Sequence, residues 1–281
     1  MEIWQAIILG LTQGASEFAP ISSSGHLILV PWFFDWPLIG GDTDFAKTFD
    51  VALHMGTLLG ALIYFRRDVW RYLRAWLGSI ARRRIATPDE RIAWALVVGT
   101  VPGVIVGALL EQLIQDNLGE PVLIAIMLAV FGVVLWWVDR VSSMRRGFDT
   151  IGPRTGLFLG TAQALALQPG VSRSGVTMTA ARVLTFDRET AARFSFLLSL
   201  PVIAGAVLYK GLDLAGEGIP PGMGGPFVAG IAASAVSGFL VIAFLLRYLR
   251  VHDFALFLWI RVAVATLIFV VIATGARPAT I

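Results

Sequence analysis

The residues best suited to chemistry lie in two short polar segments of a largely apolar chain. The first, 13–29, reads QGASEFAPISSSGHLIL and places a carboxylate, three consecutive hydroxyls and an imidazole within ten residues. A serine hydroxyl becomes a nucleophile when a base removes its proton, and histidine titrates near neutral pH. We predict that Ser23 attacks, with His26 as its base and Glu17 orienting His26 or a cation. Attack by His26 itself, or by water, stays open.

The second segment, 169–175, reads PGVSRSG and stands directly before an apolar stretch. Its Arg173 offers a planar fork of five N–H donors that suits phosphate. If both segments open half-helices, their N-terminal amides would also attract an anion. Because these donors outnumber what one carboxylate can accept, we predict a phosphate site. Its predicted binding residues are Gln13, Ser22, Ser24, Gly25, Ser172, Ser174 and Gly175.

The spacing in the first segment indicates a broken helix. Gln13 and Glu17 are four residues apart, so they share one helix face. We expect Pro20 to end that helix, Gly25 to free the turn and Ser24 to open the next half-helix. A carboxylate at membrane depth needs a cation, a donor or a proton, so Glu17 is also the candidate ligand for a metal.

Two other residues are candidates to support the site from a neighbouring helix, and for His54 a role in packing alone stays open. His54 follows Asp50 by four residues in the apolar stretch 48–65, and we expect the two side chains to pair on one face. Of the remaining polar residues, His252 is interpreted as structural, and Arg261, in the last apolar stretch, as structural or paired.

The composition shows which elements must position these residues. Of 281 residues, 57% are hydrophobic and only 15% are charged, and the mean hydropathy is +0.77. Soluble domains carry about a quarter charged residues, so the chain is predicted to be an all-α integral membrane protein. Because spans need roughly 20 apolar residues, six are predicted: 48–65, 92–110, 121–138, 190–209, 227–246 and 254–276.

Two further apolar regions, 1–34 and 155–184, are interrupted near their middle by Pro, Gly and Ser. Each half is too short to cross the bilayer, so we predict two re-entrant helical hairpins. The two regions match at an offset of 150, as in Gly10 with Gly160 and Ser22 with Ser172. We therefore predict one membrane domain, 1–281, made of two inverted-topology repeats, 1–138 and 155–281, joined by the basic loop 139–154.

The basic residues predict the orientation. Eight arginines lie in 66–91 and four more in 139–154, between apolar spans. Basic loops of this kind face the cytoplasm, which places both termini outside. The net charge of +3 has no nucleic-acid-binding pattern, so no nucleic-acid partner is expected. The partners expected are the lipid bilayer and a lipid substrate, and a homodimer is the assembly left open.

At the chemistry-bearing residues the chain resembles the bacterial undecaprenyl-pyrophosphate phosphatases of the bacitracin-resistance type. The resemblance covers essentially the whole length and rests on QGASEFAPISSSGH, PGVSRSGVT and AKTFDVALHMG. Two positions depart from the common pattern: Gln13 stands at the first acidic position, an alternative the family allows, and Ser24 stands where Thr is usual. Gln13 argues against a metal site made of two carboxylates.

The resemblance implies a multi-pass hydrolase of the bacterial cell membrane that removes the terminal phosphate of undecaprenyl pyrophosphate at the external face. The product re-enters lipid-carrier cycling for peptidoglycan synthesis. The family's functional positions match Glu17, Ser22, Ser23 and His26, with Ser172, Arg173 and Ser174 from the second segment. A divalent cation, magnesium or calcium, is implied in the same way, whereas motifs for an organic cofactor are absent from the sequence.

Two alternatives differ in mechanism or in class. A lipid phosphatase of the phosphatidic-acid-phosphatase type would need a histidine downstream of its Ser-Arg motif, and none occurs between Val176 and Val251. A transporter or flippase of a phosphorylated polyprenyl lipid would also use inverted repeats with broken helices. Release of phosphate by the purified protein separates that carrier from the enzyme.

Overall fold

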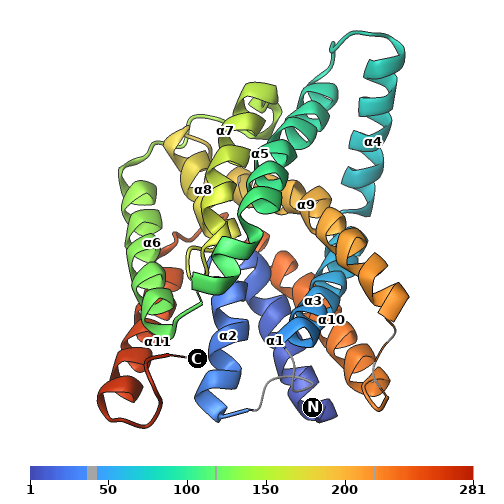
Figure 1. Ribbon diagram of the computed structural model, residues 1–281. Helices are drawn as coiled ribbons and strands as arrows, with labels where there is room; N and C mark the ends of the chain where they lie inside the picture. The colour runs from blue at the N-terminus through green and yellow to red at the C-terminus, as the bar shows by residue number, and fades with distance from the viewer. Residues whose placement is uncertain (37–42, 118, 218, 220, 281) are drawn as a thin grey trace.

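The computed structural model describes residues 1–36, 43–117, 119–217, 219 and 221–280, and every regular element in these ranges is helical (Figure 1). The prediction of an all-α protein is confirmed. The longer helices are α3 (Thr43–Tyr64), α5 (Pro88–Asn117), α6 (Pro121–Val141), α9 (Arg188–Glu217), α10 (Gly224–Tyr248) and α11 (Ala255–Ala273). The shorter ones are α1 (Ile3–Phe18), α2 (Ser23–Phe34), α4 (Arg66–Ala81), α7 (Pro153–Gln163) and α8 (Arg173–Val183), with the 3-10 turns Phe148–Thr150 and Ala164–Leu167.

Five helices of the described chain are long and apolar enough to cross a membrane, which confirms a multi-pass membrane protein. Their spans overlie five of the six predicted stretches: Pro88–Leu109, Pro121–Val141, Arg188–Tyr209, Gly224–Tyr248 and Ala255–Ala273. The sixth stretch, 48–65, falls on α3. That helix bends by 83° into α4, and the pair counts as a sixth span only when the two are taken together.

Helix α4 corrects the interpretation of 66–91 as a basic loop. Sixteen of those residues form a helix, because apolar side chains recur along one side of it among the arginines. Tyr72 of α4 is buried, whereas Trp70 and Leu77 are exposed. A count of basic residues marks the side of the membrane and does not detect this periodicity, which is why the sequence interpretation missed the helix.

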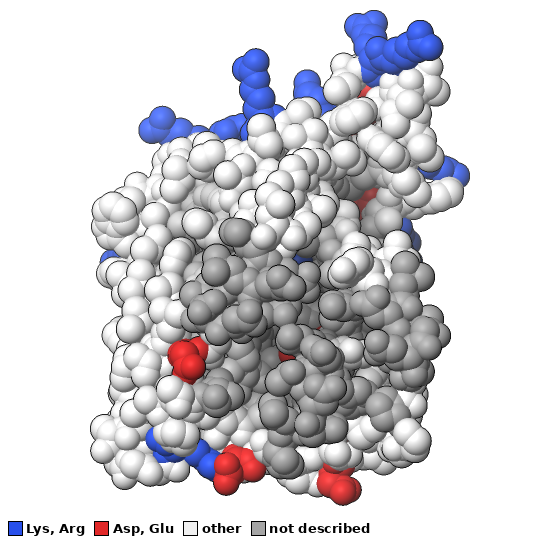
Figure 2. Space-filling view, in the orientation of Figure 1, with Lys and Arg blue, Asp and Glu red and all other residues white. Residues whose placement is uncertain are grey.

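The charged residues of the visible face separate toward the two ends of the bundle (Figure 2). Most of the visible Lys and Arg gather at the end that carries the α4–α5 and α6–α7 connections, and most of the visible Asp and Glu lie toward the other end. Both chain termini lie in the half of the molecule opposite the α4–α5 connection (Figure 1). The visible face therefore has the charge polarity that the positive-inside rule describes.

At the basic end, two arginines hold the end of α6 against α8 and α9. Arg182 is fully buried, and its Nε lies 2.7 Å from Asp139 Oδ1. Arg188 contacts the same carboxylate, with its Nη2 2.9 Å from Asp139 Oδ2. Arg182 also donates to the carbonyls of Ser142 and Ser143. These two arginines thus tie three helices together.

The apolar regions 1–34 and 155–184 are each broken in two, as predicted. Helices α1 and α2 have 16 and 12 residues, and α7 and α8 have 11 each, so none reaches the roughly 20 residues needed to span a membrane.

Glycines let the first half of each broken pair pack closely on a long helix. A Cβ on Gly14 of α1 would collide with the backbone of α10, and one on Gly160 of α7 would collide with the backbone of α5. Small residues at such contacts allow backbones to approach within a membrane, where packing drives association. This packing fixes where the ends of α1 and α7 lie, and so positions the polar segments.

Candidate active site

The second half-helix of each pair begins in the same unusual way. Ser22 caps α2 with φ 75°, and Ser172 caps α8 with φ 74°. Each hydroxyl accepts a hydrogen bond from the amide three residues on, at 3.4 Å from Gly25 N and 3.1 Å from Gly175 N. A positive φ is uncommon for residues other than glycine and costs of order 1–3 kcal/mol. Such strain persists only where the surroundings hold it, and it concentrates at functional sites.

The two turns bind each other, as the sequence predicts. Ser22 Oγ accepts from Gly170 N at 2.9 Å, so the cap of one turn also satisfies an amide of the other. In return, Ser174 Oγ donates to the carbonyl of Ala19 at 3.1 Å. The hydroxyls of Ser22 and Ser174 therefore join segments about 150 residues apart into one unit.

Glu17 lies at the centre of this unit and is 6% exposed. Its Oε1 forms an ion pair with Arg173 Nη2. Its Oε2 accepts from Ser23 Oγ at 2.5 Å and from Gln13 Nε2 at 3.1 Å. Because an unpaired carboxylate inside the membrane would cost several kcal/mol, these donors explain how the charge is retained there.

Arg173 joins the site from the start of α8, and its side chain is 18% exposed. Its contact with Glu17 uses one Nη, and it makes no other side-chain hydrogen bond within the part of the chain that the structure describes. A guanidinium carries five donors. The remaining donors suit the oxygens of a phosphate placed between the two turns.

A cavity of about 220 Å³ opens between the two turns. Glu17, Ser23 and Arg173 line it, together with Ser22, Ser24 and Ser172. The same cavity is lined by residues of α3, α5, α7, the 3-10 turn after α7, and α9, namely His54, Gly103, Gln163, Ala164, Ala166, Leu167 and Val202. Sequence reasoning assigned no role in the site to Gln163 or Gly103.

The structure does not bring Ser23 and His26 together. His26 Nδ1 lies 2.8 Å from the carbonyl of Ser22, and His26 is not among the residues that line the cavity. The Ser23 hydroxyl turns to Glu17 instead, and no hydrogen bond joins it to His26 in the described chain. Nearness in sequence suggested the pair, but the imidazole takes the nearest carbonyl one turn back along its own helix.

His54 reaches the site directly, which differs from its predicted pairing with Asp50. Its Nδ1 lies 2.7 Å from the backbone carbonyl of Asp50, and its Nε2 lies 3.6 Å from Glu17 Oε2. No hydrogen bond links the ring to the Asp50 carboxylate among the described residues. A carbonyl only accepts, so Nδ1 carries a proton and Nε2 is the nitrogen that faces the carboxylate.

Gly25 and Gly175 each lie close to a neighbouring side chain, and Ser24 and Ser174 lie close to the capping serines. Gly25 lies inside α2, so the expectation that it frees the turn is wrong; Ser22 has the left-handed conformation instead. A Cβ on Gly25 would lie 3.1 Å from Ile124 Cγ2, and one on Gly175 would lie 2.5 Å from Arg261 Nη2. Ser24 Oγ lies 3.5 Å from Ser22 Oγ, and Ser174 Oγ lies 3.2 Å from Ser172 Oγ.

Arg261 is the residue whose importance the sequence interpretation underestimated. It extends from α11, is fully buried and has no acidic partner in the described chain. Its Nε donates to the carbonyl of Pro20 at 2.5 Å and its Nη2 to that of Val171 at 3.2 Å, so one guanidinium holds both turns. Its presence in an otherwise apolar span was the available signal, because ionisable residues at such depth are functional candidates.

The residues around Glu17 supply only part of the ligand set of a divalent cation. No group of three or more His, Cys, Asp or Glu that could hold a metal occurs in the part of the chain described here. Gln13 Oε1 is buried beside the Glu17 carboxylate and accepts no hydrogen bond from the described residues. One carboxylate and one amide oxygen match a hard cation that takes its other ligands from substrate phosphates and water. These two residues alone do not form a complete cation site.

The fold and the site together define a class. The chain is a polytopic helical membrane protein whose two broken helix pairs meet inside the bundle and present hydroxyls, half-helix amides and an arginine to a polar cavity. Helix N-termini and arginine are the features that proteins use to bind phosphate.

Comparison with known proteins identifies the family. Residues 6–267 match the family described as bacitracin resistance protein BacA, and the chain belongs to that family. It is 47% identical over 277 residues to an undecaprenyl-diphosphatase of Pelotomaculum thermopropionicum, covering 99% of each chain. It is 47% identical to the protein of the same name from Moorella thermoacetica, over 96% of this chain and 98% of the relative. A third, from Thermomicrobium roseum, is 43% identical over 97% of this chain and 99% of the relative.

Proposed function

We propose that this protein hydrolyses undecaprenyl pyrophosphate to undecaprenyl phosphate and inorganic phosphate within the bacterial cell membrane. The observation that carries the proposal is the meeting of Glu17, Ser23 and Arg173 at a cavity between two half-helix N-termini. The relatives' name, undecaprenyl-diphosphatase, supplies the substrate and favours an enzyme over a carrier. The reaction returns the lipid carrier to peptidoglycan synthesis, which agrees with a family described by bacitracin resistance.

When the diphosphate binds, Arg173 exchanges Glu17 for the phosphates. Arg173 has donors that Glu17 does not use, and a diphosphate carries more charge than a carboxylate, so the Arg173 guanidinium turns from Glu17 to the phosphates. The amides at the starts of α2 and α8 contribute their partial positive charge from the two opposite turns. Because these donors are already in place, they also stabilise charge that develops on the transferred phosphoryl group.

The contact between Ser23 and Glu17 supports Glu17, rather than His26, as the group that takes the proton of Ser23. Ser23 Oγ already donates to Glu17 Oε2 at 2.5 Å. As Ser23 Oγ bonds to the terminal phosphorus, its proton passes to Glu17, and the bond from phosphorus to the bridging oxygen breaks. The lipid monophosphate leaves, and water then cleaves the phosphoserine to release inorganic phosphate. Direct attack by His26 is the rival mechanism, since its Nδ1 is held by the Ser22 carbonyl and its Nε2 makes no hydrogen bond with the described residues.

A magnesium or calcium ion would be held by Glu17 and Gln13 together with the diphosphate. When bound, such an ion neutralises phosphate charge and orients the leaving group. The chain's own residues still orient the diphosphate, supply the hydroxyl and accept its proton.

The proposal includes an orientation and a repeat. The basic end faces the cytoplasm and both termini lie outside, which the charge polarity in Figure 2 supports. The matched caps at Ser22 and Ser172 support two units of inverted topology, 1–138 and 155–281. The chain contains no cysteine, so single cysteines at Arg83 and Thr280 can be tested with an impermeant thiol reagent in intact cells. Labelling of the first and protection of the second would contradict this orientation.

The activity is tested with purified protein in detergent and undecaprenyl pyrophosphate as substrate. Wild type should release phosphate, and Ser23→Ala should lower kcat by about 100-fold or more. A Ser23→Ala enzyme with near-native kcat would eliminate serine as the nucleophile and transfer that role to His26 or water. Movement of the lipid across sealed vesicles with no phosphate release from wild type would replace the enzyme by a carrier.

A further inference from the structure

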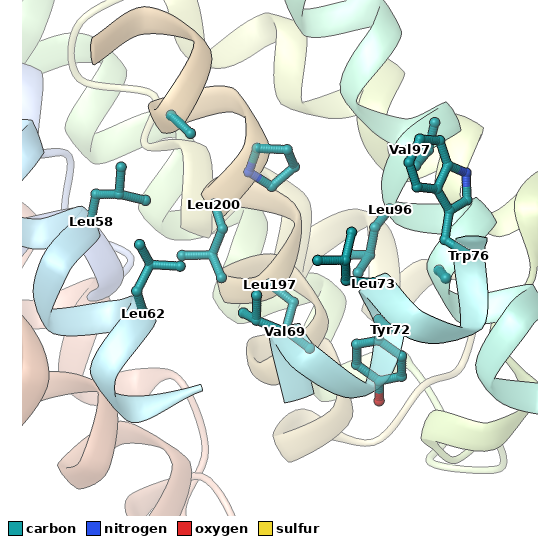
Figure 3. Close-up of a pocket in the computed structure, with 13 residues that line it drawn as sticks. Leu58, Leu62, Val69, Tyr72, Leu73, Trp76, Leu96, Val97, Leu197 and Leu200 are labelled. Carbon is teal, nitrogen blue, oxygen red and sulfur yellow. The ribbon is translucent and has the colours of Figure 1, made fainter. Parts of the chain in front are cut away.

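A second cavity, apolar and about 300 Å³ in volume, lies between α3, α4, α5 and α9 (Figure 3). The 83° bend between α3 and α4 creates it, because α4 turns away from the line of α3. Leu58 and Leu62 line it from α3, Tyr72 and Trp76 from α4, and Leu200 from α9. This space is distinct from the polar cavity between the two turns.

The lining of this groove suits a hydrocarbon chain. It consists of aliphatic and aromatic side chains, and the lining residues include no charged group. Apolar cavities do not hold water well, because water there finds no polar partners. Its volume lies at the lower limit of the range typical of small-molecule sites, about 300–1,000 Å³.

The groove adjoins the polar cavity along two helices. On α3, His54 lines the polar cavity and Leu58, one turn later, lines the groove. Four residues of helix correspond to about 6 Å. On α9, Val202 lines the polar cavity, whereas its neighbour Pro201 lines the groove. A ligand with a charged head and an apolar tail could therefore occupy both cavities at once.

We infer that this groove holds the first isoprene units of the polyprenyl chain while the diphosphate lies between the two turns. The inference rests on the proposed function and adds to it a binding site for the start of the substrate's chain. The α3–α4 bend has a role on this account, since a straight α3 would leave no wall opposite α5 and α9. An acyl chain of a membrane phospholipid is the competing occupant, and the experiments below separate the two.

The first experiment fills the groove. Ala204 of α9 lines it and is exposed, whereas Ala232 of α10 is exposed and lies outside the lining, so Ala204→Phe and Ala232→Phe form a matched pair. For each protein, kcat/KM is measured with undecaprenyl diphosphate, and the inhibition constant is measured for inorganic diphosphate, which has no chain. We expect kcat/KM to fall about tenfold or more in Ala204→Phe with the inhibition constant unchanged, and both constants to stay unchanged in Ala232→Phe. An unchanged kcat/KM in Ala204→Phe overturns the inference.

The second experiment does not depend on turnover. A polyprenyl diphosphate with a photoreactive group in its first isoprene units is cross-linked to wild type, and the adducts are mapped by mass spectrometry. Adducts at groove residues of α4 or α9 that excess undecaprenyl diphosphate prevents support the inference, even if Ala204→Phe does not fold. Adducts elsewhere, or adducts that only added phospholipid prevents, overturn it. If wild type releases no phosphate while these adducts still form, the proposed reaction fails and the chain site stands.

Discussion

Replacement of Arg173 by lysine tests whether its planar fork holds the diphosphate. Lysine keeps the charge near Glu17, so the burial of that carboxylate is still compensated, but it presents a point charge in place of a fork. Hydrogen bonds to charged groups contribute about 1.5–3 kcal/mol each. Loss of one of them to phosphate corresponds to a fall in kcat/KM of about 10- to 150-fold.

The assay measures phosphate release from undecaprenyl pyrophosphate and, separately, inhibition by inorganic diphosphate. Arg173→Lys should weaken both. Arg250→Lys is the matched control, because Arg250 also pairs with a carboxylate, that of Glu189, but on the exposed surface with a side chain 62% exposed. That control should stay near wild type, since surface pairs contribute about 0–1 kcal/mol. If Arg173→Lys binds diphosphate as tightly as wild type, the assignment of Arg173 to phosphate is refuted.

Three further changes test how the site is supported. Arg261→Met leaves two turn carbonyls without their donor, so kcat/KM should fall about tenfold or more. The same change removes a buried cation, so the melting temperature should change little. A large loss of stability with normal kcat/KM would contradict this role. Gly160→Ala should destabilise by about 1–3 kcal/mol through overlap with α5, whereas Gly205→Ala, with open space around it, should not; equal melting curves would contradict the packing. Asp139→Asn should cost about 3–5 kcal/mol, because Arg182 loses its buried counter-charge, and unchanged denaturation in detergent would count against that pair.

Much of the architecture could be predicted because membranes impose simple rules on sequence. Apolar stretches of about 20 residues become helices, and Pro, Gly and Ser interrupt them. The breaks in 1–34 and 155–184 were therefore visible, as was the meeting of their turns, since the same Gly and Ser pattern occurs twice. Helix α4 was missed because its arginines suggested a loop, although its apolar residues follow a helical period.

The pairing of side chains inside the site could not be predicted in the same way. Spacing along one helix suggested Ser23 with His26 and His54 with Asp50, because residues three or four apart share a face. In the fold, Ser23 and His54 both turn to Glu17, a residue on another helix. A carboxylate buried in the membrane attracts the donors around it. That attraction is stronger than the preference of a side chain for a neighbour on its own helix.

The sequence by itself determined that this chain is a membrane protein with two polar breaks, and it identified Glu17, Ser23 and Arg173 as the residues for phosphate chemistry. These features follow from composition and from the spacing of residues that are close together in the chain. Only the tertiary structure decided that Arg261 of α11 holds both turns and that the α3–α4 bend opens an apolar groove beside them. Those features depend on how helices cross, and the crossing is set by packing between segments far apart in the chain.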